Sequence, residues 1–123
     1  MDSSHADSFV ASWVQAWNDH DLEQILSHFS DEAVFRSPVA AQLMEGSDGI
    51  VRGKRALREY WGEGLRRFPD LHFDVLGIYS GVESLDINYR NQNGGLVNEV
   101  LIFEGGWVIE GYGTYLGGTA EAR

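Results

Sequence analysis

The apolar side chains of residues 1–30 recur with a helical period. They form two stripes in which residues three or four positions apart share one side, as expected of α-helices that bury one face. The first stripe contains Phe9, Val10, Trp13, Val14 and Trp17, and the second contains Leu22, Ile25, Leu26 and Phe29. We therefore expect two helices in this region, the first beginning near Ser3 or Ser4.

The junction between the two stripes carries the residue pattern of a helix start. Asp21 suits the N-cap position, and Gln24 follows three residues later, where its side chain can complete a reciprocal capping box. The second helix is therefore expected to begin directly after Asp21. His20 and His28 fall outside the apolar stripes, so both are expected to face solvent.

A short strand and a long connection are expected next. Residues 33–37 have strand-like composition, and Pro38 ends the strand because proline cannot donate a hydrogen bond to a sheet. Residues 39–53 contain three glycines together with two apolar pairs, which predicts a long loop. Such a loop is either a lid or wall of a pocket, or a segment that packs in a dimer or is partly mobile.

A third helix and a series of strands complete the predicted elements. Residues 54–68 place apolar side chains on one side of a helix and charged side chains on the other, where pairs such as Glu63 and Arg67 predict a salt-bridged solvent face. From residue 71 onward the period changes to two, with alternating segments at 71–75 and 85–89. The second half of the chain is therefore expected to be a run of antiparallel strands.

Two dipeptides predict the hairpin turns of this sheet. Asn93-Gly94 and Gly105-Gly106 both tolerate the positive φ angles of a type I′ turn. The predicted fold class is α+β, with three N-terminal helices packed on a curved, mainly antiparallel β-sheet. The tail, residues 116–123, is expected to fray.

The position of the second turn predicts which side chains share a sheet face. If Gly105 and Gly106 are the central turn residues, one face pairs Phe103 with Val108, Leu101 with Glu110, and Glu99 with Tyr112. A face that mixes apolar, acidic and phenolic groups suits a cavity lining, and it equally suits a half-exposed sheet. Across the other turn, a two-residue loop places Asn88 opposite Glu99, whereas a three-residue loop places Tyr89 there.

Length, charge and composition limit the classes of function. With 123 residues the chain is expected to form a single domain, residues 1–123. Nineteen acidic residues against nine basic ones give a net charge of −10, which argues against nucleic-acid and membrane partners. The sequence has no cysteine, no apolar run of the roughly 18 residues that a membrane span needs, and no cationic signal segment, so a cytoplasmic location is expected. The four histidines have no metal-ligand spacing, and neither a metal nor a cofactor is expected.

The order of motifs in the first 38 residues resembles a known superfamily. An aromatic helix is followed by Asn18-Asp-His-Asp21-Leu22, then by Phe29-Ser-Asp-Glu-Ala-Val34, a hydrophobic strand and Pro38. This order resembles the nuclear transport factor 2-like superfamily, which includes ketosteroid isomerase and the SnoaL-like polyketide cyclases. The resemblance implies a cone with an internal pocket between helices and sheet, and a homodimer formed through the other sheet face.

The resemblance also implies roles for individual positions. Glu99 falls where ketosteroid isomerase has the protonated aspartic acid of its oxyanion hole. Ser37 stands at the position of the general base, while Trp13 and Trp61 replace two tyrosines of that site. A serine hydroxyl cannot remove a carbon-bound proton at neutral pH without a base beside it, so steroid isomerisation by the usual route is not expected.

The remaining side chains suggest an aromatic box with a few polar groups, which suits a small hydrophobic ligand. The candidate substrate-binding residues are Trp13, Trp17, Phe35, Ser37, Tyr60, Trp61, Tyr89 and Leu101, and the candidate catalytic residues are Glu99, Glu110 and Tyr112. The favoured function is that of a SnoaL-like isomerase, cyclase or related acid/base enzyme acting on a polycyclic or aromatic substrate through a buried carboxyl. The alternatives are a non-catalytic ligand-binding module and a dimeric interaction module with a filled core.

Overall fold

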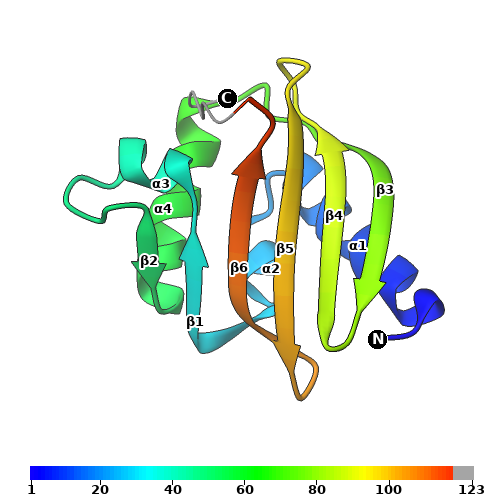
Figure 1. Ribbon diagram of the computed structural model, residues 1–123. Helices are drawn as coiled ribbons and strands as arrows, with labels where there is room; N and C mark the ends of the chain where they lie inside the picture. Colours follow the sequence, from blue (N-terminus) through cyan, green and yellow to red (C-terminus); the bar gives the residue numbers. More distant parts are fainter. Residues whose placement is uncertain (118–123) are drawn as a thin grey trace.

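Helices pack on one face of a six-stranded sheet in this computed structural model, which describes residues 1–117 (Figure 1). The helices of that part of the chain are α1 (Ser3–Asn18), α2 (Leu22–Leu26), α3 (Pro38–Leu43) and α4 (Lys54–Arg67). Its strands are β1 (Phe29–Arg36), β2 (Ile50–Arg52), β3 (Asp74–Gly81), β4 (Ser84–Arg90), β5 (Leu96–Glu104) and β6 (Trp107–Tyr115). None of these helices is long and apolar enough to span a membrane.

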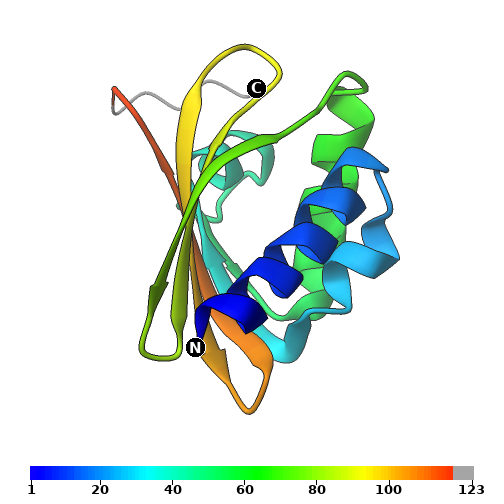
Figure 2. The ribbon, with the colours of Figure 1, turned by 90° about the vertical axis from the view of Figure 1, so that its right-hand side faces the viewer.

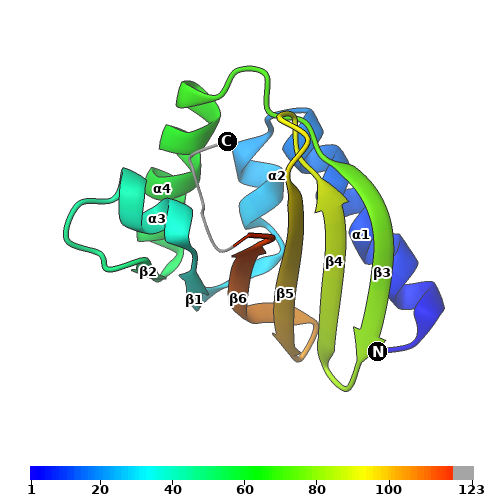
Figure 3. The ribbon, with the colours of Figure 1, turned by 45° about the horizontal axis from the view of Figure 1, so that its top comes forward.

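The strands are arranged in the order β2-β1-β6-β5-β4-β3, and every neighbouring pair is antiparallel except β1 with β6. Helices α1, α2 and α4 lie together on one side of the sheet (Figure 2). The sheet curves around them, and α3 lies beside the sheet edge formed by β2 and β1 (Figure 3). This architecture confirms the predicted α+β class with a curved, mainly antiparallel sheet.

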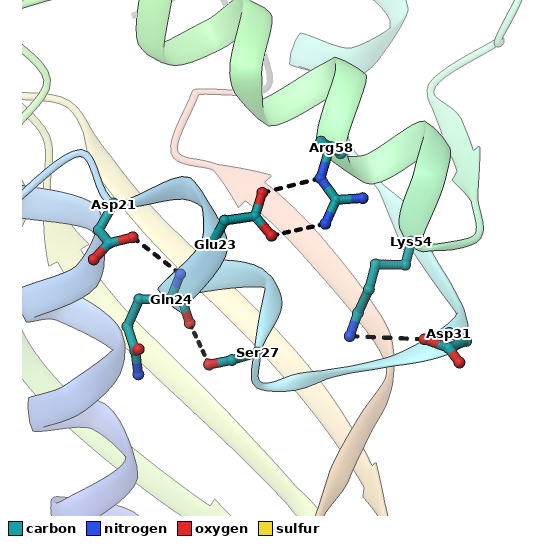
Figure 4. Close-up of polar contacts among 7 residues, drawn as sticks. All are labelled: Asp21, Glu23, Gln24, Ser27, Asp31, Lys54 and Arg58. Carbon is teal, nitrogen blue, oxygen red and sulfur yellow. Dashed lines mark hydrogen bonds and ion pairs between the residues drawn. The ribbon is translucent and has the colours of Figure 1, made fainter.

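The first two helices begin with carboxylate caps. The Asp2 side chain accepts a hydrogen bond from the backbone N–H of His5, so the cap of α1 precedes the two serines expected there. Asp21 accepts from the N–H of Gln24 at 3.1 Å, which confirms the predicted start of α2 (Figure 4). Phe29 is buried, but it opens β1 instead of continuing α2, because the helix ends after a single turn.

Ion pairs attach α4 to its surroundings. Arg58 donates from Nε and Nη2 to the two carboxylate oxygens of Glu23 on α2, at 3.0 and 2.8 Å (Figure 4). This bidentate geometry fixes both the distance and the orientation of the two helices. At the far end of α4, Glu63 pairs with Arg66 and Arg67, as the charge pattern of this helix predicted.

The two histidines expected in solvent are both half-buried. The Nε2 atom of His20 lies 2.9 Å from the carbonyl oxygen of Leu71, which ties the end of α1 to the approach to β3. The His28 ring lies edge-on to Phe9, with centroids 4.9 Å apart, and burial lowers its pKa. The prediction failed because the apolar stripe of one helix does not show which of its side chains are covered by other elements.

The segment expected to be a long loop instead contains α3 and β2, so that prediction is wrong. Ser37 caps α3 by accepting from the N–H of Val39 at 3.1 Å, and Pro38 occupies the first helical turn, where no N–H is needed. Gly49 follows the turn and its N–H is bonded to Ser47 Oγ. Strand β2 then pairs with β1 through antiparallel bonds.

The predicted register of the last hairpin is correct only next to its turn. Phe103 does pair with Val108, but a β-bulge shifts the register between Ile102 and Phe103, so Ile102 pairs with Glu110. One extra residue on a strand moves every later side chain to the opposite face. Glu110 and Tyr112 consequently lie on the other face of the sheet from Glu99, and the prediction that these three residues share a face is wrong.

The bulge also changes which residues stand opposite Glu99. Its neighbours across the sheet are Gly113 on β6 and Ile87 on β4. Neither predicted loop length applies to the preceding hairpin, because Arg90 pairs with Leu96 and leaves a five-residue connection at 91–95. The tail predicted to fray lies outside the described residues from 118 onward. The first residue of that tail, Leu116, is described and donates its N–H to the carbonyl oxygen of Leu96 at 3.0 Å.

Gly111 provides a test of this packing. A Cβ atom at this position would stand 2.5 Å from Cδ1 and 2.7 Å from Cε1 of Phe35, a buried ring that packs on Trp61. We expect Gly111→Ala to lower the free energy of unfolding by about 1 to 3 kcal/mol, because a packed ring must move. Urea denaturation measures the change.

The matched control is Gly62→Ala in the middle of α4, where the nearest atom to the added Cβ is Leu22 Cδ2 at 3.4 Å. Alanine is favoured over glycine by about 1 kcal/mol inside a helix, so this variant should be neutral or stabilised. Equal stability of the two variants would contradict the proposed contact between Gly111 and Phe35.

Candidate functional site

A cavity lies between the inner face of the sheet and helices α1, α3 and α4. Its volume is about 60 Å³, measured as the space open to the centre of a water molecule. The core beneath the helices is therefore hollow at this point, since one water needs only about 10 to 15 Å³ on this measure. The cavity is lined by Trp17, Phe35, Val39, Leu43, Tyr60, Trp61, Gly64, Phe68, Leu71, Phe73, Tyr89, Asn91, Glu99 and Tyr115.

Aromatic rings that hold one another in place form most of the cavity wall. Trp17 from α1 meets Trp61 from α4 edge to face, with centroids 5.6 Å apart. Trp61 also contacts Phe35 of β1 at 5.4 Å, and Phe73 lies 4.2 Å from Tyr89 of β4. Rings fixed at such angles provide a preformed apolar surface for a flat molecule.

Glu99 places a carboxyl group in this apolar wall. Glu99 is 5% exposed, and its Oε1 atom accepts a hydrogen bond from the Tyr89 hydroxyl at 3.2 Å. None of the cations in residues 1–117 forms an ion pair with it. Burial raises the pKa of Glu99 to about 8, against the opposing effect of the Tyr89 hydrogen bond. The carboxyl group is therefore mainly protonated at neutral pH.

The neighbouring phenols are neutral as well. Burial raises the pKa of Tyr60, and the nearby Tyr115 and Glu99 raise it further, while a hydrogen bond with Ser37 acts in the opposite direction. Burial, followed by the proximity of Glu99, raises the pKa of Tyr89. The polar part of the cavity thus consists of uncharged groups that can donate protons or hydrogen bonds.

Six of the predicted site residues line the cavity, and they come from α1, β1, α4, β4 and β5. They are Trp17, Phe35, Tyr60, Trp61, Tyr89 and Glu99. Trp13, Leu101 and Ser37 do not line it. Trp13 is fully buried against Phe73 and Tyr89, and Leu101 is fully buried in the core near Gly111.

Glu110 and Tyr112 belong to a separate cluster on the outer sheet face. Arg36 Nη1 donates to Glu110 Oε2 at 3.0 Å and to the Tyr112 hydroxyl at 3.4 Å. The Tyr112 hydroxyl also donates to Glu110 Oε2 at 3.1 Å, and the guanidinium lies over the Tyr112 ring. These two predicted catalytic residues therefore do not meet Glu99, because the β-bulge in β6 turns them away.

The sequence prediction missed several lining residues. Asn91, Phe73 and Tyr115 are the most informative, and the others are Val39, Leu43, Gly64, Phe68 and Leu71. The signal for Asn91 was the alternation of Ile87 and Tyr89, which continues two residues further into the connection after β4. Val39 and Leu43 could not be found in this way, because they belong to a helix that was not expected. No group of three or more His, Cys, Asp or Glu side chains in residues 1–117 could hold a metal ion.

A curved sheet, covered by helices around an aromatic cavity with one buried carboxyl, defines the class of the protein as nuclear transport factor 2-like. Residues 10–85 match the SnoaL-like domain family, and the chain belongs to this family. No curated protein matches the sequence.

Solved structures support the same assignment. A SnoaL-like protein of unknown function from Burkholderia thailandensis is 39% identical, with a TM-score of 0.89 over 95% of this chain and 99% of that one. AclR from Streptomyces galilaeus, provisionally described as a hydroxylase, is 22% identical, with a TM-score of 0.73 over 93% and 90% of the two chains. IdmH from Streptomyces antibioticus, provisionally described as a polyketide cyclase, is 17% identical, with a TM-score of 0.74 over 90% and 91%. The last two show likeness of fold.

The raised pKa of Glu99 predicts how stability depends on pH. Between about pH 4.5 and pH 8 the folded protein retains the Glu99 proton while the unfolded chain loses it, so the free energy of unfolding falls as the pH rises. The Glu99 contribution to this slope is at most about 1.4 kcal/mol per pH unit. We expect Glu99→Gln to remove it, as measured by urea denaturation at several values between pH 5 and pH 8.

A second variant tests the cause of the shift. The Tyr89 hydroxyl favours the ionised carboxylate, so Tyr89→Phe should raise the pKa of Glu99 further and extend the loss of stability to higher pH. Identical slopes in the wild type and Glu99→Gln would show that this carboxyl is not desolvated.

Proposed function

We propose that this protein binds a small, flat, largely apolar molecule in the cavity and uses Glu99 as a neutral acid toward it. The observation that carries the proposal is the carboxyl group of Glu99, buried in an aromatic wall without a cation from residues 1–117 beside it, and this burial raises its pKa. Structural ion pairs do not account for this carboxyl, and a perturbed acid in a cavity is a common mark of a functional site.

The chemistry available to such a group is hydrogen bonding or proton donation to oxygen. A protonated carboxyl in an apolar site can stabilise a carbonyl oxygen, and more strongly the negative charge that develops on it during enolisation. Glu99 is the one carboxylic acid among the described lining residues, so the cavity wall supplies no second carboxylate as a base. We therefore infer that Glu99 assists the isomerisation, cyclisation or a related reaction of an aromatic or polycyclic carbonyl compound by giving its proton to the carbonyl oxygen, and that the resulting carboxylate takes up the proton released from carbon.

The names of the structural relatives agree with a ligand of this class without selecting a reaction. IdmH is provisionally described as a polyketide cyclase and AclR as a hydroxylase, so one fold carries different activities. The alternative of a non-catalytic binding protein uses the same cavity. In that case Glu99 contributes affinity, and no probe is converted. The hollow between the helices and the sheet favours both of these functions over an interaction module with a filled core.

The pH dependence of ligand binding tests the role of Glu99. We expect 2-acetylnaphthalene, which has no ionisable group, to quench the tryptophan fluorescence of the protein. Its affinity should fall by up to about tenfold per pH unit above about pH 8, because ionised Glu99 cannot donate a hydrogen bond. Glu99→Gln retains an N–H donor and should bind with little dependence on pH.

The matched control is Glu104→Gln, which makes the same change at an exposed position on the same strand. It should retain the wild-type dependence on pH. Binding that is independent of pH in the wild type would contradict the acid role of Glu99, and a lack of binding would contradict the proposed function as a whole.

We also propose that a second copy of the chain covers the outer sheet face. Within residues 1–117, no helix packs on this face, which carries the half-buried side chains of Val34, Val100 and Ile102 beside the Arg36 cluster. Asp86 lies on the same face, and its Oδ1 atom is enclosed without a partner among the described residues. Apolar side chains together with an unsatisfied acceptor favour a partner surface there.

Sedimentation velocity tests this dimer. We expect the wild type to sediment at twice the 13.7 kDa chain mass and Ile102→Lys to sediment as a monomer, because a charge among the apolar side chains of this face opposes its burial. Val82→Lys, at a position that is 92% exposed, should remain dimeric. A wild type that is monomeric at all concentrations would overturn the assignment.

A further inference from the structure

Asn91 is a buried polar residue of the cavity wall. It continues the inward alternation of β4, in which Ile87 and Tyr89 also face the helices, and it is 5% exposed. Tyr89 and Asn91 both line the cavity. Its position therefore resembles that of Glu99, since each is a polar side chain placed on an otherwise apolar inner face.

Hydrogen bonds fix the orientation of the Asn91 side chain. Its Oδ1 atom accepts from the backbone N–H groups of Asn93 at 3.1 Å and Gly95 at 2.9 Å. The backbone of Asn91 is bonded to the same connection, through Gly95 oxygen and Gly94 nitrogen, each at 2.9 Å. If the carboxamide were flipped, its NH₂ group would face these two backbone N–H donors and both hydrogen bonds would be lost. The oxygen thus faces the connection, and the nitrogen faces away from it.

The amide nitrogen of Asn91 is left without an acceptor. Nδ2 donates no hydrogen bond to residues 1–117, and it is not one of the atoms that the protein fully encloses without a partner. The adjacent Gln92 makes a useful contrast, because its amide nitrogen is also unpaired but is enclosed and does not belong to a residue of the cavity lining. The Asn91 donor belongs to a residue of the cavity lining, is not enclosed and makes no bond to the described residues, so it indicates a place for an acceptor on a ligand.

The strand register separates this donor from the acid. Glu99 pairs with Ile87, whereas Asn91 stands four positions beyond Ile87 in the direction of β4. At about 3.3 Å per residue, the two levels lie about 13 Å apart along the strand. Glu99 and Asn91 therefore place two of the cavity's hydrogen-bond donors at different levels, in addition to the phenol hydroxyls of Tyr60 and Tyr89.

We propose that Asn91 is a specificity-determining residue whose Nδ2 atom donates a hydrogen bond to an oxygen acceptor on the bound molecule. The ligand is then an aromatic or polycyclic compound with a carbonyl-type oxygen at each end, one at Glu99 and the other at Asn91. This inference rests on the proposed binding function of the cavity and adds the chemical class of the ligand to it.

Two probes of the same shape test the proposed hydrogen bond between Asn91 and the second oxygen of the ligand. The probes are 2,6-diacetylnaphthalene and 2-acetyl-6-isopropenylnaphthalene, which differ by the replacement of one carbonyl oxygen by a CH₂ group. Both are titrated at pH 6, where Glu99 is neutral. We expect the wild type to bind the diacetyl compound about tenfold more tightly, as detected by tryptophan fluorescence.

The variant Asn91→Asp is the sharpest change at this position. An aspartate oxygen still accepts from the N–H groups of Asn93 and Gly95, while the donor toward the cavity becomes an acceptor. The preference for the diacetyl compound should disappear or reverse. The matched control, Asn93→Asp, adds the same charge at an exposed position of the same connection and should keep the preference.

The possible results separate this inference from the function on which it rests. Equal binding of the two probes by the wild type, or a preference that survives in Asn91→Asp, overturns the role of Asn91 and leaves the binding function standing. Failure of both probes to bind overturns both. If Asn91→Asp does not fold, the side-chain amide signal of Asn91 in the ¹H–¹⁵N spectrum decides, since only the diacetyl compound should shift it.

Discussion

The residue inserted into β6 at the bulge controls which side chains reach the cavity. Between the turn and the bulge the hairpin follows the simple pairing of Phe103 with Val108, and beyond the bulge every side chain of β6 lies on the face opposite to that expected from this pairing. The inner face then receives Gly111 and Gly113, which leave room for Phe35 and Ser37, while the larger Glu110 and Tyr112 face outward. A hollow beside Glu99 can exist because glycines, and not a glutamate and a tyrosine, stand on the inner side of the last strand.

The electrostatic character of the cavity follows from this arrangement. The chain carries a net charge of −10, yet among residues 1–117 the acidic groups lie mostly at the surface and a single carboxylic acid lines the cavity. Without a cation beside it, Glu99 gains more by keeping its proton than by ionising. Arg36 is bound to Glu110 on the outer face. Because Arg36 follows the inward-facing Phe35 on β1, its guanidinium lies on the opposite side of the sheet from Glu99, and the buried acid keeps its proton.

The elements with strong local sequence patterns were predicted correctly, and the predictions failed where contacts between distant residues determine the structure. The apolar stripes identified α1, α2 and α4, and Asp21 marked a helix start that the structure confirms. The segment 39–53 was mistaken for a loop because α3 is short and β2 exists only through its pairing with β1. Glu99, which the resemblance singled out, is buried and lines the cavity, whereas Glu110 faces the other side of the sheet because a bulge leaves little trace in the alternation of residues. Asn91 was not predicted as a site residue, because it follows the end of β4 and its burial depends on elements far away in the sequence.

The parallel pairing of β1 with β6 sets the order in which the domain can be completed during synthesis. Arg36 meets Tyr112 across a separation of 76 positions, and β6 joins the β1–β2 pair to the meander of β3, β4 and β5. Until β6 has left the ribosome, no strand joins the β1–β2 pair to the strands β3, β4 and β5. The aromatic rings that line the cavity then lack part of the sheet on which they pack. Closing such a long loop is slow compared with forming local contacts. The nascent protein therefore exposes its aromatic side chains until the final strand is in place, and a chain that stops before β6 cannot form the site.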